Sequence, residues 1–252
     1  VFFPVTKSPL DLFSQVQFLD PWLLDQQSYY SFRARYAVIV QRSVGTHSFQ
    51  HIVKYQRLDE LQEKIQNFST RILKSDCLDL PEKVYTKRVV SLTAEQVKAY
   101  TEMKKAAITF FEDNVMTAAS VLTQIIRLHQ ITCGHFKTDD GEVKSIKSNR
   151  IKELLEVLEE TNGKVIIWAV YRYDIQQIEK TLGDKYGKES VATYYGDTKD
   201  SIRQSIVDRF MDPDDPLRFF VGNPKTGGYG LTLTSSHTVV YYSNDYSLEI
   251  RL

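Results

Sequence analysis

Cysteine, long apolar runs and an excess of charge of either sign are all scarce or missing in this chain. Two cysteines in 252 residues, Cys77 and Cys133, cannot form a disulfide framework, so a reducing compartment is the default. No apolar run approaches the ~20 residues of a membrane span. Thirty-two basic residues balance thirty-two acidic ones, so a nucleic-acid site has to be a local patch.

Two nucleotide-binding signatures are also missing. Neither a G-x-x-x-x-G-K-[ST] phosphate loop nor an Asp-Glu-x-His motif occurs in the sequence. The nearest pattern, at residues 222–228, places Lys225-Thr226 before a glycine pair instead of after it. This order is wrong for a phosphate loop.

A glycine-rich turn, Gly227-Gly228-Tyr229-Gly230, is the most informative feature that is present. Apolar stretches suited to strands lie on both sides of it, at 219–221 and 239–242. Glycine permits a positive φ and lets an anion approach backbone N–H groups closely. The turn therefore predicts a nucleotide or a nucleic-acid backbone as ligand, and the alternative is a turn that only closes a strand.

The pattern of apolar residues changes near residue 148. Downstream, continuous apolar runs predict strands at 164–169, 191–195, 219–221 and 238–242, with helical spacing at 151–158, 175–182 and 202–210. This alternation predicts an α/β lobe with a parallel sheet. Upstream, residues 1–148 are expected to be mostly helical: Thr93 and Gln96 fit a capping box for a helix to about Glu112. A polar stretch at 137–147 is expected to connect the two parts.

Several segments, in the right order, resemble the Swi/Snf-type DNA translocases of helicase superfamily two. They lie at residues 6–13 (after motif III), 68–74 and 80–83 ("LP-x-K"), 92–100, 127–131, 163–172 (motif IV), 195–197 and 221–234 (motif V). Three departures stand out. Val1-Phe2-Phe3 replaces the family's Thr-Gly-Thr, Asn223-Pro224 replaces its Ser-Thr, and Thr232 replaces its Asn. Because proline has no N–H, one phosphate contact is in doubt at Pro224.

The resemblance implies a division into three parts. Residues 1–75 would be the C-terminal end of a first RecA-like lobe, 76–148 a helical insertion and connector, and 149–252 a truncated second RecA-like (helicase C-terminal) lobe. In this family ATP and Mg²⁺ bind between two lobes, mainly through the phosphate loop of the first. The arginine-bearing sixth motif would begin just past Leu252. The resemblance thus implies a parent that hydrolyses ATP and moves along duplex DNA without sequence preference, and a fragment that is inactive alone.

The site residues follow from the resemblance. Lys225, Thr226, Gly227 and Gly228 are expected to contact the DNA backbone, and the alternative is a structural turn. Arg172 is a further candidate for a phosphate, against a solvated arginine. Gly230 is placed nearest the nucleotide.

Several other residues have competing interpretations. Trp168 is expected in the core and Asp197 as a helix cap, while Asp245 follows a strand where sites cluster. His129, Cys133 and His135 are interpreted as packing rather than metal ligands, because too few partners exist for zinc. Arg71 and Lys74 fit either a basic brace or exposed helix charge.

Two rival functions stay open at this point. One is a non-catalytic DNA- or protein-binding module with a degenerate helicase lobe, favoured by Asn223-Pro224. The other is an RNA helicase of the same superfamily, which the helical insertion and the "LP-x-K" segment disfavour. The expected location is intracellular, in the cytoplasm or nucleoid of a bacterial or phage system and in the nucleus of a eukaryote.

Overall fold

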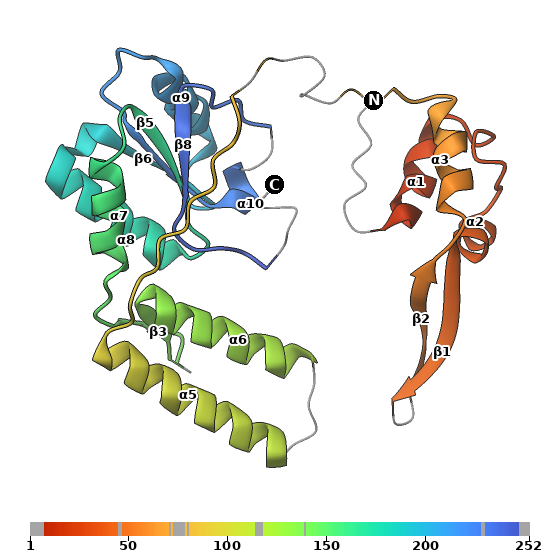
Figure 1. The fold of residues 1–252 in the computed structure, drawn as a ribbon, viewed down its shortest axis with the longest axis horizontal. Helices are drawn as coiled ribbons and strands as arrows, with labels where there is room; N and C mark the ends of the chain where they lie inside the picture. The colour runs from red at the N-terminus through yellow and green to blue at the C-terminus, as the bar shows by residue number, and fades with distance from the viewer. Residues whose placement is uncertain are drawn as a thin grey trace. The chain divides into compact units, whose positions relative to one another are not determined.

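A computed structural model describes this chain at residues 8–44, 47–70, 72, 79, 81–113, 118–138, 140–227 and 230–246. These residues fall in two units, Val1–Tyr85 and Thr86–Leu252 (Figure 1). The segments at residues 71 and 73–78, which include Arg71 and Lys74, lie outside the described residues.

Four parallel strands form the sheet of the second unit. They are β5 (Lys164–Trp168), β6 (Val191–Tyr194), β7 (Phe219–Gly222) and β8 (Ser236–Tyr241), in the order β6-β7-β5-β8. Every pairing is parallel. Each strand lies within two residues of its predicted position, so the predicted parallel α/β lobe is confirmed.

Helices cover both faces of this sheet (Figure 1). On one face, α7 (Arg150–Glu159) and α8 (Arg172–Tyr186) bury Leu158, Ile175 and Ile178 against β5 and β7. On the other face, α9 (Asp200–Met211) buries Ile206 and Phe210. The predicted core residue Trp168 is buried beside Phe210 and Phe220 in that second cluster. The continuous apolar runs of β5 and β7 are explained by this burial on both faces.

A helical hairpin precedes the sheet in the same unit. It consists of α5 (Ala94–Asp113) and α6 (Ala118–Cys133), and a small antiparallel pair, β3 (His135–Lys137) and β4 (Val143–Ser145), follows it. The predicted capping box is present: the Thr93 N–H donates to Gln96 Oε1 (3.1 Å) and the Gln96 N–H to Thr93 Oγ1 (3.2 Å). Buried Gln96 also donates from Nε2 to the Ile131 carbonyl (2.8 Å), which joins the start of α5 to the end of α6.

The polar stretch at 137–147 contributes to the β3–β4 hairpin inside the second unit, and the boundary between the units lies near residue 85. The assignment of 1–75, 76–148 and 149–252 to parts of two lobes therefore stays a prediction.

The first unit contains an antiparallel hairpin that the sequence did not predict. It begins with η1 (Pro9–Asp11), α1 (Leu12–Leu19) and α2 (Tyr29–Tyr36), continues through β1 (Ala37–Val44) and β2 (His47–Tyr55), and ends with α3 (Leu58–Gln66). Phe32 and Tyr36 of α2 are completely buried at its centre. Glu60 of α3 accepts hydrogen bonds from Arg35 (2.7 Å) and from the Tyr36 hydroxyl (2.9 Å), which fixes α3 against α2.

Candidate nucleic-acid interface

The carboxyl ends of the four parallel strands meet at one edge of the sheet, which we call the carboxyl edge. In open α/β sheets ligands bind at this edge. Asp197 follows β6, Lys225 follows β7, Arg172 follows β5 and Asp245 follows β8. Two predicted DNA contacts, Arg172 and Lys225, thus follow adjacent strands of the sheet, although they lie 53 positions apart in the chain.

Asn223 holds the turn that follows β7. Its side chain accepts the N–H of Lys225 (2.9 Å) and donates to the Val170 carbonyl (2.9 Å). Its own carbonyl accepts the N–H groups of Thr226 (3.0 Å) and Gly227 (2.9 Å) and so begins the short helix α10 (Pro224–Gly227). The three N–H groups of residues 225–227 are thus occupied within the chain, and the exposed part of the turn is the Lys225 side chain.

Gly222 and Gly227 allow the turn to pack against Trp168. A Cβ at Gly222 would lie 2.7 Å from Trp168 Cζ3, and one at Gly227 would lie 3.1 Å from the same ring. These two glycines thus serve close packing. Gly228 lies outside the described residues. Gly230 is exposed, has a φ of 75°, and has no atom within 4 Å of a Cβ built there, so its requirement for glycine is conformational.

Both candidate cations are in ion pairs at the carboxyl edge. Arg172 Nη2 lies 3.0 Å from Asp197 Oδ1, and Lys225 Nζ lies 2.8 Å from Asp245 Oδ2. Given the strand order, the first pair spans β7 and the second spans β5. Both members of the Arg172–Asp197 pair are exposed, and such pairs contribute only ~0–1 kcal/mol, so a competing anion can displace Asp197. In the second pair Lys225 is mostly exposed, whereas the Asp245 side chain is only 14% exposed.

The prediction that Asp197 caps a helix is wrong. The N-cap of α9 is Lys199, and no side chain bonds to the start of that helix. Asp197 lies two residues earlier, and its carboxylate pairs with Arg172 instead. The Asp197 carboxylate thus contacts the arginine that follows β5 and does not cap α9.

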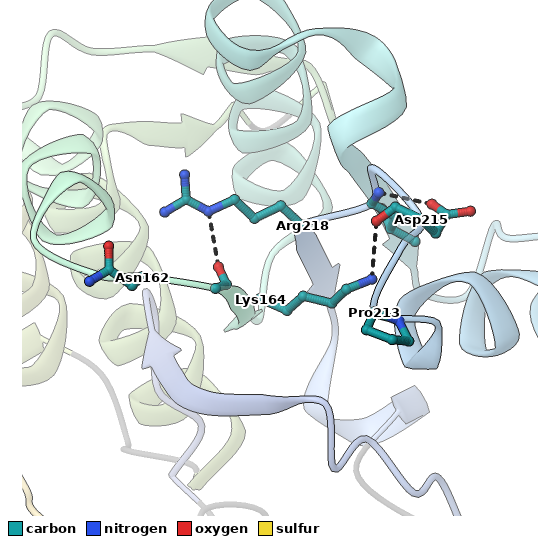
Figure 2. Close-up of a pocket in the computed structure, with 7 residues that line it drawn as sticks. Asn162, Lys164, Pro213, Asp215 and Arg218 are labelled. Carbon is teal, nitrogen blue, oxygen red and sulfur yellow. Dashed lines mark hydrogen bonds between the residues drawn. The ribbon is translucent and has the colours of Figure 1, made fainter.

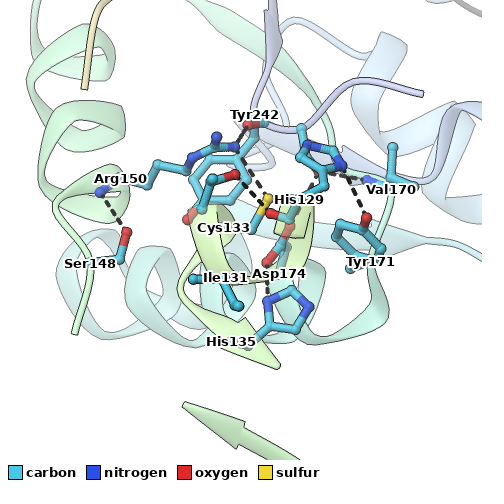
Figure 3. Close-up of polar contacts among 12 residues, drawn as sticks. His129, Ile131, Cys133, His135, Ser148, Arg150, Val170, Tyr171, Asp174 and Tyr242 are labelled. Carbon is cyan, nitrogen blue, oxygen red and sulfur yellow. Dashed lines mark hydrogen bonds and ion pairs between the residues drawn. The ribbon is translucent and has the colours of Figure 1, made fainter. Parts of the chain in front are cut away.

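A polar cluster with a buried centre lies next to the residues that follow β5 and β8 (Figure 3). We call it the Asp174 cluster; its members are His129, His135, Tyr171, Asp174 and Ser243. Asp174 Oδ1 lies 3.2 Å from His135 Nδ1, and Asp174 Oδ2 accepts a hydrogen bond from the Ser243 hydroxyl (3.2 Å). The Tyr171 hydroxyl lies 3.0 Å from His129 Nδ1. The cluster joins α6 and β3, which carry its two histidines, to the start of α8, which carries Asp174, and to Ser243 after β8.

Burial disfavours the charged forms of two members of the cluster, His129 and Tyr171. Burial lowers the pKa of His129, and the Arg150 guanidinium lowers it further. Burial also raises the pKa of the Tyr171 hydroxyl. Among the described residues, no group of three or more His, Cys, Asp or Glu side chains forms a metal site. His129, Cys133 and His135 contact Tyr171, Arg150 and Asp174 respectively.

No motif in the sequence identifies Asp174 or Ser243 as members of a site. The one available signal was helical spacing, because Asp174 lies four residues before the buried Ile178 and so shares its helix face. An acidic residue on a buried face needs a partner, and nothing local identifies His135, which lies 39 residues earlier.

We expect the Cys133 thiol to resist alkylation in the folded protein. Burial raises its pKa to about 12, with Asp174 adding to the effect. In mildly alkaline buffer its thiolate population is then about three orders of magnitude below that of a free cysteine. Iodoacetamide labelling followed by peptide mass spectrometry checks this, with the chain unfolded in guanidinium as the control. Equal labelling of folded and unfolded chains would contradict it.

The opposite end of the sheet carries an open depression of about 340 Å³ (Figure 2). Both cations that line it, Lys164 and Arg218, contact backbone carbonyls. Lys164 Nζ contacts the carbonyls of Arg209 (3.2 Å) and Asp212 (2.6 Å) at the end of α9. Arg218 donates to the carbonyls of Leu158 (3.0 Å) and Thr161 (2.6 Å) after α7. Cations at helix C-termini stabilise those ends, so these residues are structural.

Comparison with known families agrees with this geometry. A family model described as SNF2-related domain matches residues 3–137, more than half of the chain. The chain belongs to the SNF2-related family. A second model, Helicase conserved C-terminal domain, matches residues 146–251 of this SNF2-related chain. The resemblance inferred from the motifs is confirmed.

Two relatives share just over a quarter of their aligned residues with this chain. YwqA of Bacillus subtilis, whose name describes a candidate ATP-dependent helicase/translocase, is 28% identical over 198 residues, 74% of this chain and 21% of YwqA. The SWI/SNF chromatin-remodeling complex subunit snf22 of Schizosaccharomyces pombe is 26% identical over 206 residues, 75% of this chain and 12% of snf22. The chain thus spans about a fifth or less of these relatives.

A solved structure shows the same fold. The SWI2/SNF2 ATPase C-terminal domain of Sulfolobus solfataricus matches with a TM-score of 0.52 and 22% identity, over 62% of this chain and 70% of that one. The predicted helicase C-terminal lobe is confirmed as the fold of the sheet. Within the part of the chain that the structure describes, no helix has the length and apolar character needed to cross a membrane.

Proposed function

We propose that this chain is part of an ATP-dependent DNA translocase or helicase and that its carboxyl edge binds the DNA backbone. The observation that carries the proposal is the placement of Lys225 and Arg172. Two exposed cations from distant parts of the chain meet at the ligand-binding edge of a helicase C-terminal fold. The name of YwqA describes an ATP-dependent helicase/translocase, which supports the same activity for the parent protein.

Phosphates would replace carboxylates at this edge. Asp245 and Asp197 hold the two cations in place while DNA is absent. A DNA duplex carries about one negative charge per 1.7 Å of its axis, and binding releases condensed counterions from it. Lys225, with Thr226 beside it, and Arg172 then contact phosphate oxygens through their side chains. Because such contacts carry no base information, the binding is tolerant of sequence and sensitive to salt.

The parent would divide the ATPase work between two lobes. This sequence contains no phosphate loop, so ATP and Mg²⁺ would be bound mainly by a first lobe, with residues 1–75 at its end, 76–148 as insertion and 149–252 as second lobe. Gly230, exposed and with a positive φ, would lie closest to the nucleotide. Alone, the chain is expected to show no ATPase activity.

Lys225→Glu in the full-length protein is expected to abolish DNA-stimulated ATP hydrolysis, because it places a carboxylate against both the phosphate and Asp245. The measurement is the ATPase rate with and without duplex DNA. The matched control is Lys180→Glu, an equal charge change at an exposed site on α8. Retained stimulation in Lys225→Glu would refute the assignment of this turn.

A second candidate is a non-catalytic binding module. The occupied N–H groups of residues 225–227 and the proline at 224 favour it, because a turn that has lost its free N–H groups contacts phosphate through side chains alone. A full-length protein that binds DNA without hydrolysing ATP would support this alternative. Comparing duplex DNA, single-stranded DNA and RNA as ligands separates both candidates from an RNA helicase.

A further inference from the structure

Residues 26–58 carry a local excess of positive charge in a chain that has none overall. This segment contains no Asp or Glu and five basic residues: Arg33, Arg35, Arg42, Lys54 and Arg57. In the structure it forms α2 and the β1–β2 hairpin of the first unit (Figure 1). A basic patch of this kind is the electrostatic footprint of a polyanion partner.

A β-bulge sorts the hairpin residues between two faces. The register pairs Ile39 with Ile52 and then Val38 with Lys54, so Val53 is the extra residue. Ile39, Ile52 and Tyr55 pack against the core of the unit. Because of the bulge, Lys54 comes to the outer face, together with the cross-strand pairs Val40–His51 and Arg42–Phe49.

This outer hairpin face consists of Val40, Arg42, Phe49, His51, Val53 and Lys54, all exposed. Its three apolar members, Val40, Phe49 and Val53, have 37%, 47% and 52% of their surface exposed. Within the described residues, neither Arg42 nor Lys54 has an ion-pair partner, whereas Arg35 nearby is paired with Glu60. The face therefore combines two uncompensated cations with an exposed aromatic ring.

We propose that the outer hairpin face is a second duplex-DNA contact of this protein, separate from the carboxyl edge. The major groove is ~12 Å wide and admits a two-stranded β-ribbon. Lys54 pairs with Val38, four residues before Arg42, so the two cations lie ~13 Å apart along the ribbon. The two cations can thus reach phosphates on both sides of the groove while Phe49 contacts base edges. The proposal rests on the proposed function only in taking DNA as the ligand.

The test is DNA binding by the whole chain as a function of salt. Fluorescence anisotropy with a short mixed-sequence duplex gives the affinity of the wild type and of Arg42→Gln/Lys54→Gln. Each lost phosphate contact lowers the slope of log affinity against log salt by about 0.9, so we expect a fall of about 1.8 and at least ~10-fold weaker binding. Arg42→Lys/Lys54→Arg should restore both. The matched control, Lys152→Gln/Lys180→Gln, removes the same charge from exposed positions on α7 and α8.

The outcomes separate this inference from the proposed function. An unchanged slope in the hairpin variant, with a reduced one in Lys225→Glu, overturns the hairpin contact and keeps the carboxyl edge. The reverse result keeps the hairpin and refutes the edge. An equal fall in the control shows a general charge effect and overturns the inference. The inference is also overturned if the hairpin substitutions change only self-association or binding to an acidic protein. A wild-type chain that binds no duplex refutes both.

Discussion

Replacing Asp174 with alanine is expected to lower the free energy of unfolding of the second unit by about 3 kcal/mol or more. The side chain is 1% exposed and its two oxygens face His135 and Ser243, both buried. Alanine leaves the Ser243 hydroxyl without its acceptor and removes the carboxylate 3.2 Å from the buried His135 ring, and each such loss at a buried polar group costs about 1–3 kcal/mol. It also leaves a small cavity between α8 and β3.

Urea unfolding followed by tryptophan fluorescence measures this effect. The chain has two tryptophans, Trp22 in the first unit and Trp168 in the second, so a Trp22→Phe background reports the second unit alone. Asp197→Ala is the control, because it removes a carboxylate from an exposed pair and should cost no more than ~1 kcal/mol. Similar losses in the two variants would show that the Asp174 cluster does not hold the unit together.

Gly222→Ala is expected to destabilise the same unit by about 1–3 kcal/mol, the range for overpacking a filled core. The added Cβ would lie 2.7 Å from Trp168 Cζ3 and 3.0 Å from the Tyr194 carbonyl oxygen. The carbonyl belongs to β6 and cannot rotate away, so the Trp168 ring must shift. Thermal unfolding monitored by circular dichroism gives the size of the loss without relying on the displaced tryptophan.

Gly183→Ala is the matched control for this variant. Gly183 lies inside α8, and the nearest atoms to its Cβ position are at 3.8 Å, an ordinary contact. Alanine there should stabilise by about 0.5–1 kcal/mol, because glycine is unfavourable within a helix. Opposite signs for the two Gly→Ala changes are expected. A loss at Gly183, or none at Gly222, would contradict the packing described for the turn.

The sheet was predictable from sequence because each strand is buried in a way that leaves a pattern. The β5 and β7 runs are apolar throughout since helices cover both faces, and helical spacing marks α7 to α9 clearly. The capping box at Thr93 and Gln96 was predictable for a local reason, as its two residues are three apart. Each of these signals lies within one element.

What the sequence could not predict depends on contacts between distant elements. In the β1–β2 hairpin, the bulge at Val53 breaks the alternation that identifies a half-buried strand. The Lys225–Asp245 pair and the His135–Asp174 contact join residues 20 and 39 positions apart. The Gly227 N–H donates to the Asn223 carbonyl, and a Cβ at Gly227 would lie 3.1 Å from the Trp168 ring, two contacts that no local pattern identifies. The predicted contacts of Lys225, Thr226, Gly227, Gly228 and Arg172 with DNA stay predictions.

The α5–α6 hairpin is attached to the rest of the second unit near the start of α5 and the end of α6. Gln96 joins the start of α5 to the end of α6, and the His135–Asp174 contact joins the strand after α6 to the start of α8. The 20 residues of α5 extend ~30 Å from this point. A rigid-body rotation of the hairpin by about 10° about this point would move the far end of α5 through about 5 Å, by the geometry of a rod of that length.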